Sequence, residues 1–115
     1  MSKDMMASFE LYQPDSVDNA IDLLGRFGED GWAMAGGHDT LDWFKDRVKY
    51  AANVVDLSGI DELRGIRETV NGIEIGALTT LTEIERSTLI QENYSVLSDA
   101  ARRVASPQIR HTGTI

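Results

Sequence analysis

The sequence predicts an α/β (α+β) fold, in which helices pack against a small mixed sheet of about four or five strands. Two observations lead to this prediction. Strand patterns and helix patterns alternate along the first part of the chain, which is typical of helices packed on a sheet. Farther on, two short strand patterns flank Asn71-Gly72. That dipeptide suits a type I′ hairpin turn, so part of the sheet would be antiparallel.

The first predicted strand covers residues 8–12, where apolar and polar residues alternate, and Pro14 ends it. A helix follows, capped by Asp15 or Ser16, because apolar residues then recur at helical spacing. These apolar residues are Val17, Ala20, Ile21, Leu24 and Phe27. Gly28 is expected to end this helix in the left-handed conformation that glycines often adopt there.

Two more strands and a helix are predicted in the next segment. Residues 32–35 form a short apolar run that reads as a buried strand, and Gly36-Gly37 breaks it. A helix is predicted over residues 39–48. Its apolar side would carry Leu41, Phe44 and Val48. Residues 53–57 are rich in valine and form the next predicted strand.

The hairpin strands are predicted over residues 63–69 and 73–78. Thr80 and Glu83 then fit a capping box, so a helix should begin there. One more helix is indicated by apolar residues at helical spacing. They are Tyr94, Leu97, Ala101 and Val104. Residues 106–115 show no helical periodicity and are predicted as a terminal loop.

The composition narrows the possible functions. The chain has 115 residues, enough for one domain, and a net charge of −8 from 19 acidic and 11 basic residues. An acidic electrostatic field of this kind disfavours the binding of nucleic acid and a polybasic contact with a membrane. No apolar run approaches the roughly 18 residues that span a bilayer, and no secretory signal is visible. A cytoplasmic location is therefore expected.

The sequence contains no cysteine. Thiolate ligands for an iron–sulfur cluster are thus excluded from this chain, as are disulfides and a cysteine nucleophile. Any such centre would have to belong to a partner protein.

Gly36-Gly37 is the most informative feature, because an apolar strand runs into the two glycines and a helix starts immediately afterwards. Glycines allow close approach of a ligand to the backbone, and a helix start offers N–H groups to an anion such as a pyrophosphate. A tight turn capped by Asp39, with no ligand, explains the same spacing. Neither GxGxxG nor GxxxxGK[ST] occurs in the chain, so Rossmann and P-loop sites find no support.

Four segments in order resemble one known family. They read AGGHDTLDWFKDR, VVDLSGIDELRGI, GIEIGALTTLTEIE and ASPQIRHTGTI. The pattern resembles the FAD-binding (medium) subunit of the molybdenum hydroxylases, which include xanthine dehydrogenase, aldehyde oxidoreductase and carbon monoxide dehydrogenase. The resemblance covers nearly the whole chain. It implies that residues 1–115 are the N-terminal part of a two-lobed FAD-binding domain.

In that family, two glycine-bearing loops hold the FAD diphosphate with backbone N–H groups. The match to the first loop consists of Ala33, Met34, Ala35, Gly36, Gly37, His38, Asp39 and Thr40. The second loop usually reads TIGGN, and Thr114 and Ile115 match its first two residues before the sequence ends inside that loop. The cofactor-binding residues implied for this segment are Thr112, Gly113 and Thr114. Two positions differ from the usual pattern: His38 stands where Thr or Ser is also common, and Gly113 stands where Ala is usual.

The resemblance implies an electron-transfer function for an oxidoreductase subunit that is inactive as an isolated fragment. A large subunit would carry the molybdenum cofactor, and a small subunit would carry [2Fe-2S] clusters. FAD would pass their electrons to NAD, a quinone or oxygen. The alternative is a non-enzymatic interaction or small-molecule-binding domain with a structural Gly-Gly turn. A third reading is an inert piece of a broken reading frame.

No side chain is expected to act as a catalytic acid, base or nucleophile, and no metal site is expected. For His38, the sequence identifies no partner for proton transfer. His111 lies 73 positions away in the sequence, so the two histidines are poor evidence for a metal site. Trp43 and Phe44 are expected to pack in the core, although aromatic rings here could border a flavin. The aspartates of residues 18–46 read as a solvated acidic face.

Overall fold

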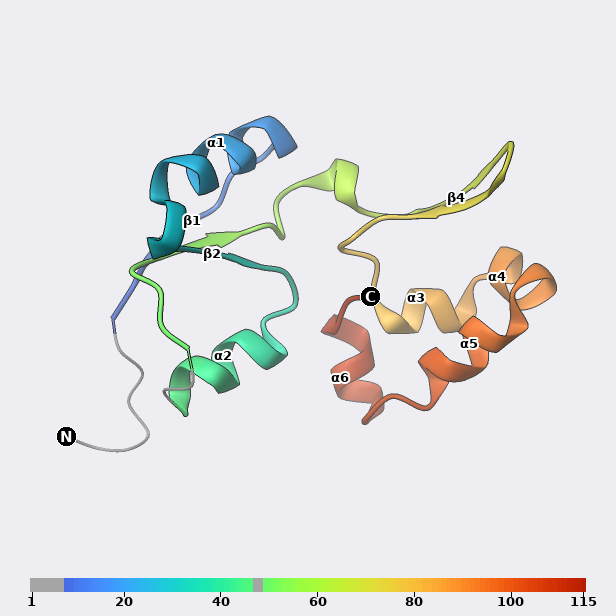
Figure 1. Cartoon of the computed structure of the whole chain (residues 1–115). Coiled ribbons are helices and arrows are strands. Elements are labelled where there is room, and N and C mark those ends of the chain that lie inside the picture. Colours follow the sequence, from blue (N-terminus) through green and yellow to red (C-terminus); the bar gives the residue numbers. More distant parts are fainter. Residues whose placement is uncertain (1–7, 47–48) are drawn as a thin grey trace. The chain divides into compact units, whose positions relative to one another are not determined.

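A computed structural model describes residues 8–46 and 49–115 of the chain (Figure 1). The chain divides into two compact units, Met1–Asp61 and Glu62–Ile115. Each unit has a hydrophobic core of its own. Strands and helices alternate in the first unit, whereas the second consists of a hairpin followed by short helices. The α/β (α+β) class predicted from the sequence is confirmed.

The first unit contains a three-stranded parallel sheet in the order β1-β3-β2. Its strands are β1 (Glu10–Tyr12), β2 (Gly31–Met34) and β3 (Asn53–Asp56). The central strand β3 pairs with both neighbours, so that Val54 lies opposite Leu11 on one side and Trp32 on the other. Val54 and Val55 point to opposite faces of the sheet, and both are fully buried.

Two helices connect the parallel strands. They are α1 (Val17–Phe27), which a short 3₁₀ turn η1 (Gly28–Asp30) follows, and α2 (His38–Lys45). Because β3 lies between the other strands, right-handed crossovers carry the two helices to opposite faces, and Figure 1 shows them on either side of the strands. Phe44 of α2 packs with Val54 and Ala51, while Phe27 of α1 contacts the ring of Tyr12.

The predicted ends of these helices need two corrections. Ser16 caps α1 by accepting a hydrogen bond from the Asn19 N–H, and Gly28 follows with a φ of 55°. The positive φ is what a glycine permits, but the ψ of −126° lies outside the left-handed helical region that was predicted. The second helix begins at His38 and ends at Lys45. The predicted apolar position Val48 lies outside the described residues.

Asp56 ends β3 with a buried carboxylate, which is 8% exposed. Its oxygens accept hydrogen bonds from the Gln13 amide at 3.0 Å and from the Ser58 N–H at 3.0 Å. Burial by itself raises the pKa of this carboxyl. The hydrogen bonds from Gln13 and from the backbone and side chain of Ser58 outweigh burial, and the pKa lies below its ordinary value.

The second unit begins at Glu62, within the 3₁₀ turn η2 (Asp61–Leu63), and its first strands form a two-stranded antiparallel hairpin. Its strands are β4 (Ile66–Thr69) and β5 (Gly72–Ile75). Four short helices follow: α3 (Leu81–Arg86), α4 (Thr88–Asn93), α5 (Ser95–Arg102) and α6 (Pro107–Thr112). The core is built from Ile84, Ile90 and Ala101, against which the hairpin isoleucines and Leu97 pack.

The two flanks of the hairpin approach each other closely at Gly76. Its N–H donates to the Gly65 carbonyl at 2.8 Å, and the Leu78 N–H donates to the Leu63 carbonyl at 2.9 Å. A Cβ on Gly76 would lie 2.2 Å from the Leu63 carbonyl oxygen. Since this neighbour is backbone, only glycine fits here. Thr79 is buried beside it, and its hydroxyl accepts from the Gly65 N–H and donates to the Gly65 carbonyl.

The hairpin forms, but not in the predicted way. It makes a separate sheet and does not extend the parallel one. Thr69 pairs with Gly72, which leaves Val70 and Asn71 at the turn. Among the non-glycine residues that the structure describes, only Ala105 has a positive φ. Asn71 therefore lacks the positive φ that a type I′ turn needs, and the predicted turn type is wrong.

The helix predicted to start after Thr80 is confirmed with its full capping box. The terminal loop predicted over residues 106–115 is wrong, because α6 occupies most of it. Ser106 caps α6 through the Ile109 N–H, and Pro107 stands in its first turn, a position that proline favours. A helix this short does not repeat its apolar positions, so periodicity could not identify it.

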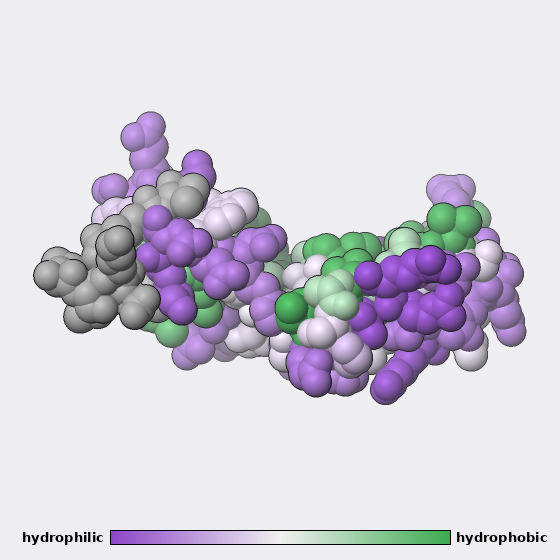
Figure 2. All heavy atoms as spheres, turned by 90° about the horizontal axis from the view of Figure 1, so that it is seen from below, coloured by the Kyte–Doolittle hydropathy of each residue, from purple (hydrophilic) through white to green (hydrophobic). Residues whose placement is uncertain are grey.

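Hydrophilic residues cover much of the face seen in Figure 2, and hydrophobic residues form limited groups between them. The large apolar side chains that stay exposed include Val70 at the hairpin turn and Val96 on α5. Within the described residues, no helix is long and apolar enough to cross a membrane.

The Gly76→Ala substitution is expected to destabilise the second unit by about 3 kcal/mol, because the new Cβ overlaps a carbonyl that cannot move without breaking a hydrogen bond. Urea unfolding followed by far-ultraviolet circular dichroism measures this loss. Gly25→Ala is the matched control. Nothing lies within 4 Å of its Cβ position, so helix propensity should raise stability by about 0.5–1 kcal/mol. Equal effects of the two substitutions would contradict the packing described at Gly76.

The hydrogen-bonded Asp56 carboxylate should make the first unit sensitive to acid. A carboxyl whose folded pKa is depressed contributes stability above its unfolded pKa, near 3.8, and this contribution is lost as the pH falls through the folded pKa. At pH 7, Asp56→Asn should cost about 1.5–3 kcal/mol. The difference from the wild type should shrink below about pH 4. Urea titrations followed by tryptophan fluorescence test this, and a difference that stays constant down to pH 2.5 would contradict it.

Candidate functional site

The glycine turn joins the carboxyl end of β2 to the start of α2. Met34 is the last residue of β2, and its carbonyl accepts a hydrogen bond from the Leu57 N–H at 2.9 Å. This bond ties the strand end to the residue that follows β3. Gly37 is the N-cap of α2, with φ 84° and ψ −5° in the left-handed region, which strongly favours glycine. The turn therefore starts at the carboxyl edge of the parallel sheet, where α/β proteins commonly bind ligands.

The start of α2 has no side-chain cap, a feature that it shares with the start of α5 among the described helices. A serine or threonine hydroxyl accepts from a first-turn N–H in α1, α3, α4 and α6. In α2 the N-cap is Gly37, which has no side chain and makes no such bond. The first-turn N–H groups and the positive end of the helix dipole are thus presented to an incoming group. This arrangement fits an anion held by backbone contacts, such as a diphosphate.

The side chains around the turn separate into two sets. His38 and Asp39 are exposed in the first turn of α2, where Asp39 places a negative charge. Thr40 is half-buried instead, and its hydroxyl oxygen accepts a hydrogen bond from the Trp32 indole N–H at 3.0 Å.

The aromatic residues on this face of the sheet pack as a group. Trp32 lies edge-on to Phe44 at 5.9 Å and to Trp43 at 6.1 Å between ring centroids. Phe44 is buried, as predicted, at 4% exposure. Trp43 packs against Trp32 but keeps 41% of its surface exposed, so the prediction that Trp43 lies in the core is wrong.

The second candidate segment, 112–114, lies in the second unit and is fixed to the start of α3. The Leu81 N–H donates to the Gly113 carbonyl at 2.9 Å, and Thr114 forms an antiparallel bridge with Thr80. The Ile115 N–H donates to the Thr79 carbonyl at 3.1 Å. Gly113 itself is buried and adopts an extended conformation, with φ −65° and ψ 136°. The segment therefore leaves α6 in an extended conformation and is held against the start of α3.

Two side chains that were not predicted as functional hold α6 in place. His111 accepts or donates through Nδ1 to the Thr82 hydroxyl at 3.0 Å, which joins α6 to α3. Arg110 donates through Nη1 to the Val104 carbonyl at 2.8 Å and to the Ala105 carbonyl at 3.4 Å. Ala105 adopts a φ of 45°, so Arg110 braces a strained turn. No sequence signal identified either contact, because both depend on tertiary packing.

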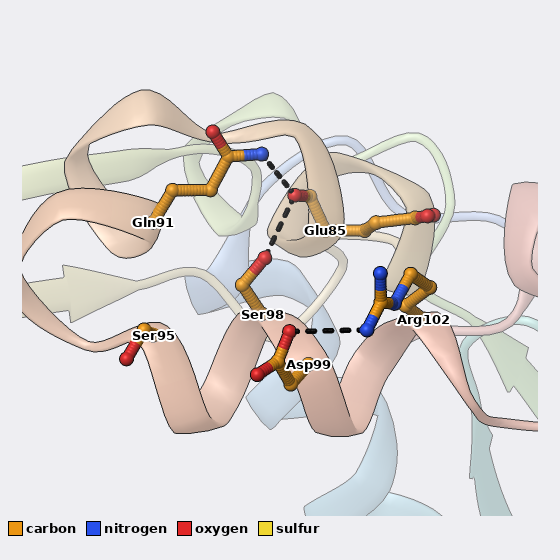
Figure 3. Close-up of a pocket in the computed structure, with 6 residues that line it drawn as sticks. All are labelled: Glu85, Gln91, Ser95, Ser98, Asp99 and Arg102. Atoms are coloured by element: carbon orange, nitrogen blue, oxygen red, sulfur yellow. Dashed lines mark hydrogen bonds and ion pairs between the residues drawn. The ribbon is translucent and has the colours of Figure 1, made fainter.

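A polar hollow of about 370 Å³ lies on the helical part of the second unit (Figure 3). Its lining residues are Glu85, Gln91, Ser95, Ser98, Asp99 and Arg102. The Glu85 carbonyl accepts from the Gln91 amide at 2.8 Å and from the Ser98 hydroxyl at 2.9 Å, and Arg102 pairs with Asp99. None of the residues that line this hollow belongs to a predicted site. In the described ranges, no group of three or more His, Cys, Asp or Glu could hold a metal ion.

Comparison with known proteins gives a family match over residues 7–115, to the family described as the FAD binding domain in molybdopterin dehydrogenase. The carbon monoxide dehydrogenase medium chain of Hydrogenophaga pseudoflava is 40% identical over 107 residues, which cover 93% of this chain and 37% of that protein. The nicotinate dehydrogenase FAD-subunit of Eubacterium barkeri is 39% identical, covering 96% of this chain and 38% of that protein.

Solved structures agree with these matches. Carbon monoxide dehydrogenase from Hydrogenophaga pseudoflava superposes with a TM-score of 0.92 at 38% identity, over 96% of this chain and 38% of that chain. Reconstituted CO dehydrogenase from Oligotropha carboxidovorans gives 0.93 at 34% identity, with the same coverage. The chain thus spans a little over a third of the length of these relatives. The resemblance drawn from the sequence motifs is confirmed, and the chain belongs to the family of FAD-binding domains of molybdopterin dehydrogenases.

Proposed function

We propose that this chain forms part of the FAD-binding subunit of a molybdenum hydroxylase, and that backbone N–H groups of residues 33–40 hold the FAD diphosphate. The single observation that supports this most is the start of α2, where a left-handed Gly37 leaves the first-turn N–H groups without a side-chain cap. The family resemblance assigns a second contribution to Thr112, Gly113 and Thr114. FAD supplies the redox chemistry, and the protein supplies its position and electrostatic environment.

The composition and the names of the relatives support the proposed electron path. Electrons would arrive from [2Fe-2S] clusters on a small subunit, after substrate oxidation at a molybdenum cofactor on a large subunit. The chain contains no cysteine, so it cannot supply the thiolates that hold such clusters. The relatives are described as medium chains or FAD-subunits, which fits a division of cofactors among subunits. FAD would then pass the electrons to an external acceptor.

We also propose that residues 1–115 are the N-terminal part of a longer domain and are inactive alone. The relatives are matched over only 37% to 38% of their length. The glycines and asparagine of the family's second loop, TIGGN, follow the two residues that match Thr114 and Ile115 here. A complete diphosphate site therefore needs residues beyond these.

FAD titration by flavin fluorescence quenching tests the proposed function. The 115-residue chain is compared with the same chain extended through the second glycine loop and the remaining lobe, taken from its own downstream coding sequence. Tight binding by the extended chain, with much weaker binding by the short one, is the expected result. Absence of binding by both would overturn the flavoprotein function and leave Gly36-Gly37 as a structural turn. Equal binding by both would contradict the proposed truncation alone.

Gly37→Ala should weaken FAD binding by about fivefold in the extended chain. The left-handed conformation costs a non-glycine residue about 1 kcal/mol, and relief of this strain turns the first-turn N–H groups away from the diphosphate. Crowding is not the cause, since the nearest atoms to the new Cβ lie 3.5 Å away, on Leu41 and Met34. Gly25→Ala, on an open side of α1, should leave the dissociation constant unchanged. An unchanged constant in both variants would argue against this loop as the diphosphate site.

A further inference from the structure

We infer that Trp32 and Thr40 are positioning residues for the diphosphate loop, acting through the hydrogen bond between their side chains. The inference rests on the proposed function, because it concerns the same loop. Trp32 belongs to β2 and Thr40 to the first turn of α2, so the bond joins the two elements that flank Gly36-Gly37. It spans the turn from the side of the sheet, whereas His38 and Asp39 are exposed.

The position of the Trp32 indole is fixed by packing. Its ring is held edge-on by Trp43 and Phe44 of α2, and it packs against the buried cluster that contains Val54. An indole N–H can only donate, and a half-buried donor of this kind needs a partner. The Thr40 hydroxyl oxygen is that partner at 3.0 Å. The separation between the strand end and the helix start is therefore set by one rigid ring.

The position of Thr40 within the helix gives the bond a second effect. Thr40 is the third residue of α2 after the N-cap. In α3 the equivalent residue is Glu83, and its carboxylate accepts a hydrogen bond from the N-cap N–H of Thr80 at 3.2 Å. A side-chain oxygen at this position can thus occupy a backbone donor at the helix start. Trp32 holds the Thr40 oxygen on the side of the sheet, so we expect this oxygen not to occupy the corresponding donor of α2.

The inference predicts that removal of either partner weakens FAD binding although neither side chain touches the cofactor. Trp32→Phe keeps an aromatic ring but removes the donor, and Thr40→Val keeps the shape but removes the acceptor. Each should raise the FAD dissociation constant about threefold to tenfold. The double variant should be no weaker than the weaker single one, because both changes break the same bond. Thr40→Ser retains the hydroxyl and should restore binding.

The measurement uses the form of the protein that binds FAD in the titration above. Gly25→Ala on α1 is again the control, since nothing lies within 4 Å of its Cβ position and the bond between Trp32 and Thr40 stays intact. Its dissociation constant should equal that of the wild type. Urea midpoints are measured in parallel, because a purely structural role would lower the midpoint without changing the dissociation constant of the folded protein.

The outcomes separate the inference from the proposed function. If the wild type binds FAD but both single variants bind it equally well, the positioning role is overturned and the function stands. Additive losses in the double variant, or a Thr40→Ser variant as weak as Thr40→Val, would also overturn it. If the wild type binds no FAD, the proposed function fails, and the inference fails with it.

Discussion

The pairing of β3 with both of its neighbours is the constraint on which the first unit depends. Its two valines are fully buried on opposite faces, so one strand supplies the core beneath both α1 and α2. The same strand fixes the site, because the residue that follows it is bonded to the last carbonyl of β2. The glycine turn consequently leaves the sheet from an edge that is already ordered by backbone hydrogen bonds and by the buried Asp56.

Much of this fold could be predicted from the sequence, and the failures have physical causes. The helix from Val17 to Phe27 is long enough to repeat its apolar positions, so periodicity identifies it. The hairpin was located correctly, yet its separation from the parallel sheet depends on long-range pairing that no local pattern encodes. Its turn type was wrong because the strand register, which the dipeptide alone does not determine, places Val70 and Asn71 at the turn. Ser106 and Pro107 are typical of a helix start, but α6 was missed because its six residues are too few to repeat an apolar position.

The candidate site was predicted unevenly for similar reasons. A strand, two glycines and a helix start are local features, so the turn at Gly36-Gly37 was visible in the sequence. The hydrogen bond between Trp32 and Thr40 was not, because residues eight positions apart meet only once α2 folds back on the sheet. The same holds for the terminal segment, which pairs with residues around Thr80. Family resemblance pointed to both segments, whereas packing explains how each is held.

Under the proposed function, the glycine cap of α2 has a consequence for the kinetics of ligand binding. Backbone N–H dipoles act over a few ångströms, whereas the net charge of −8 acts at longer range. An anionic ligand approaching the chain is therefore repelled during the diffusional encounter and attracted only after it reaches the turn. Added salt screens the first effect much more than the second. Association then becomes faster as ionic strength rises, while the residence time of the bound anion is set by the short-range contacts and changes little.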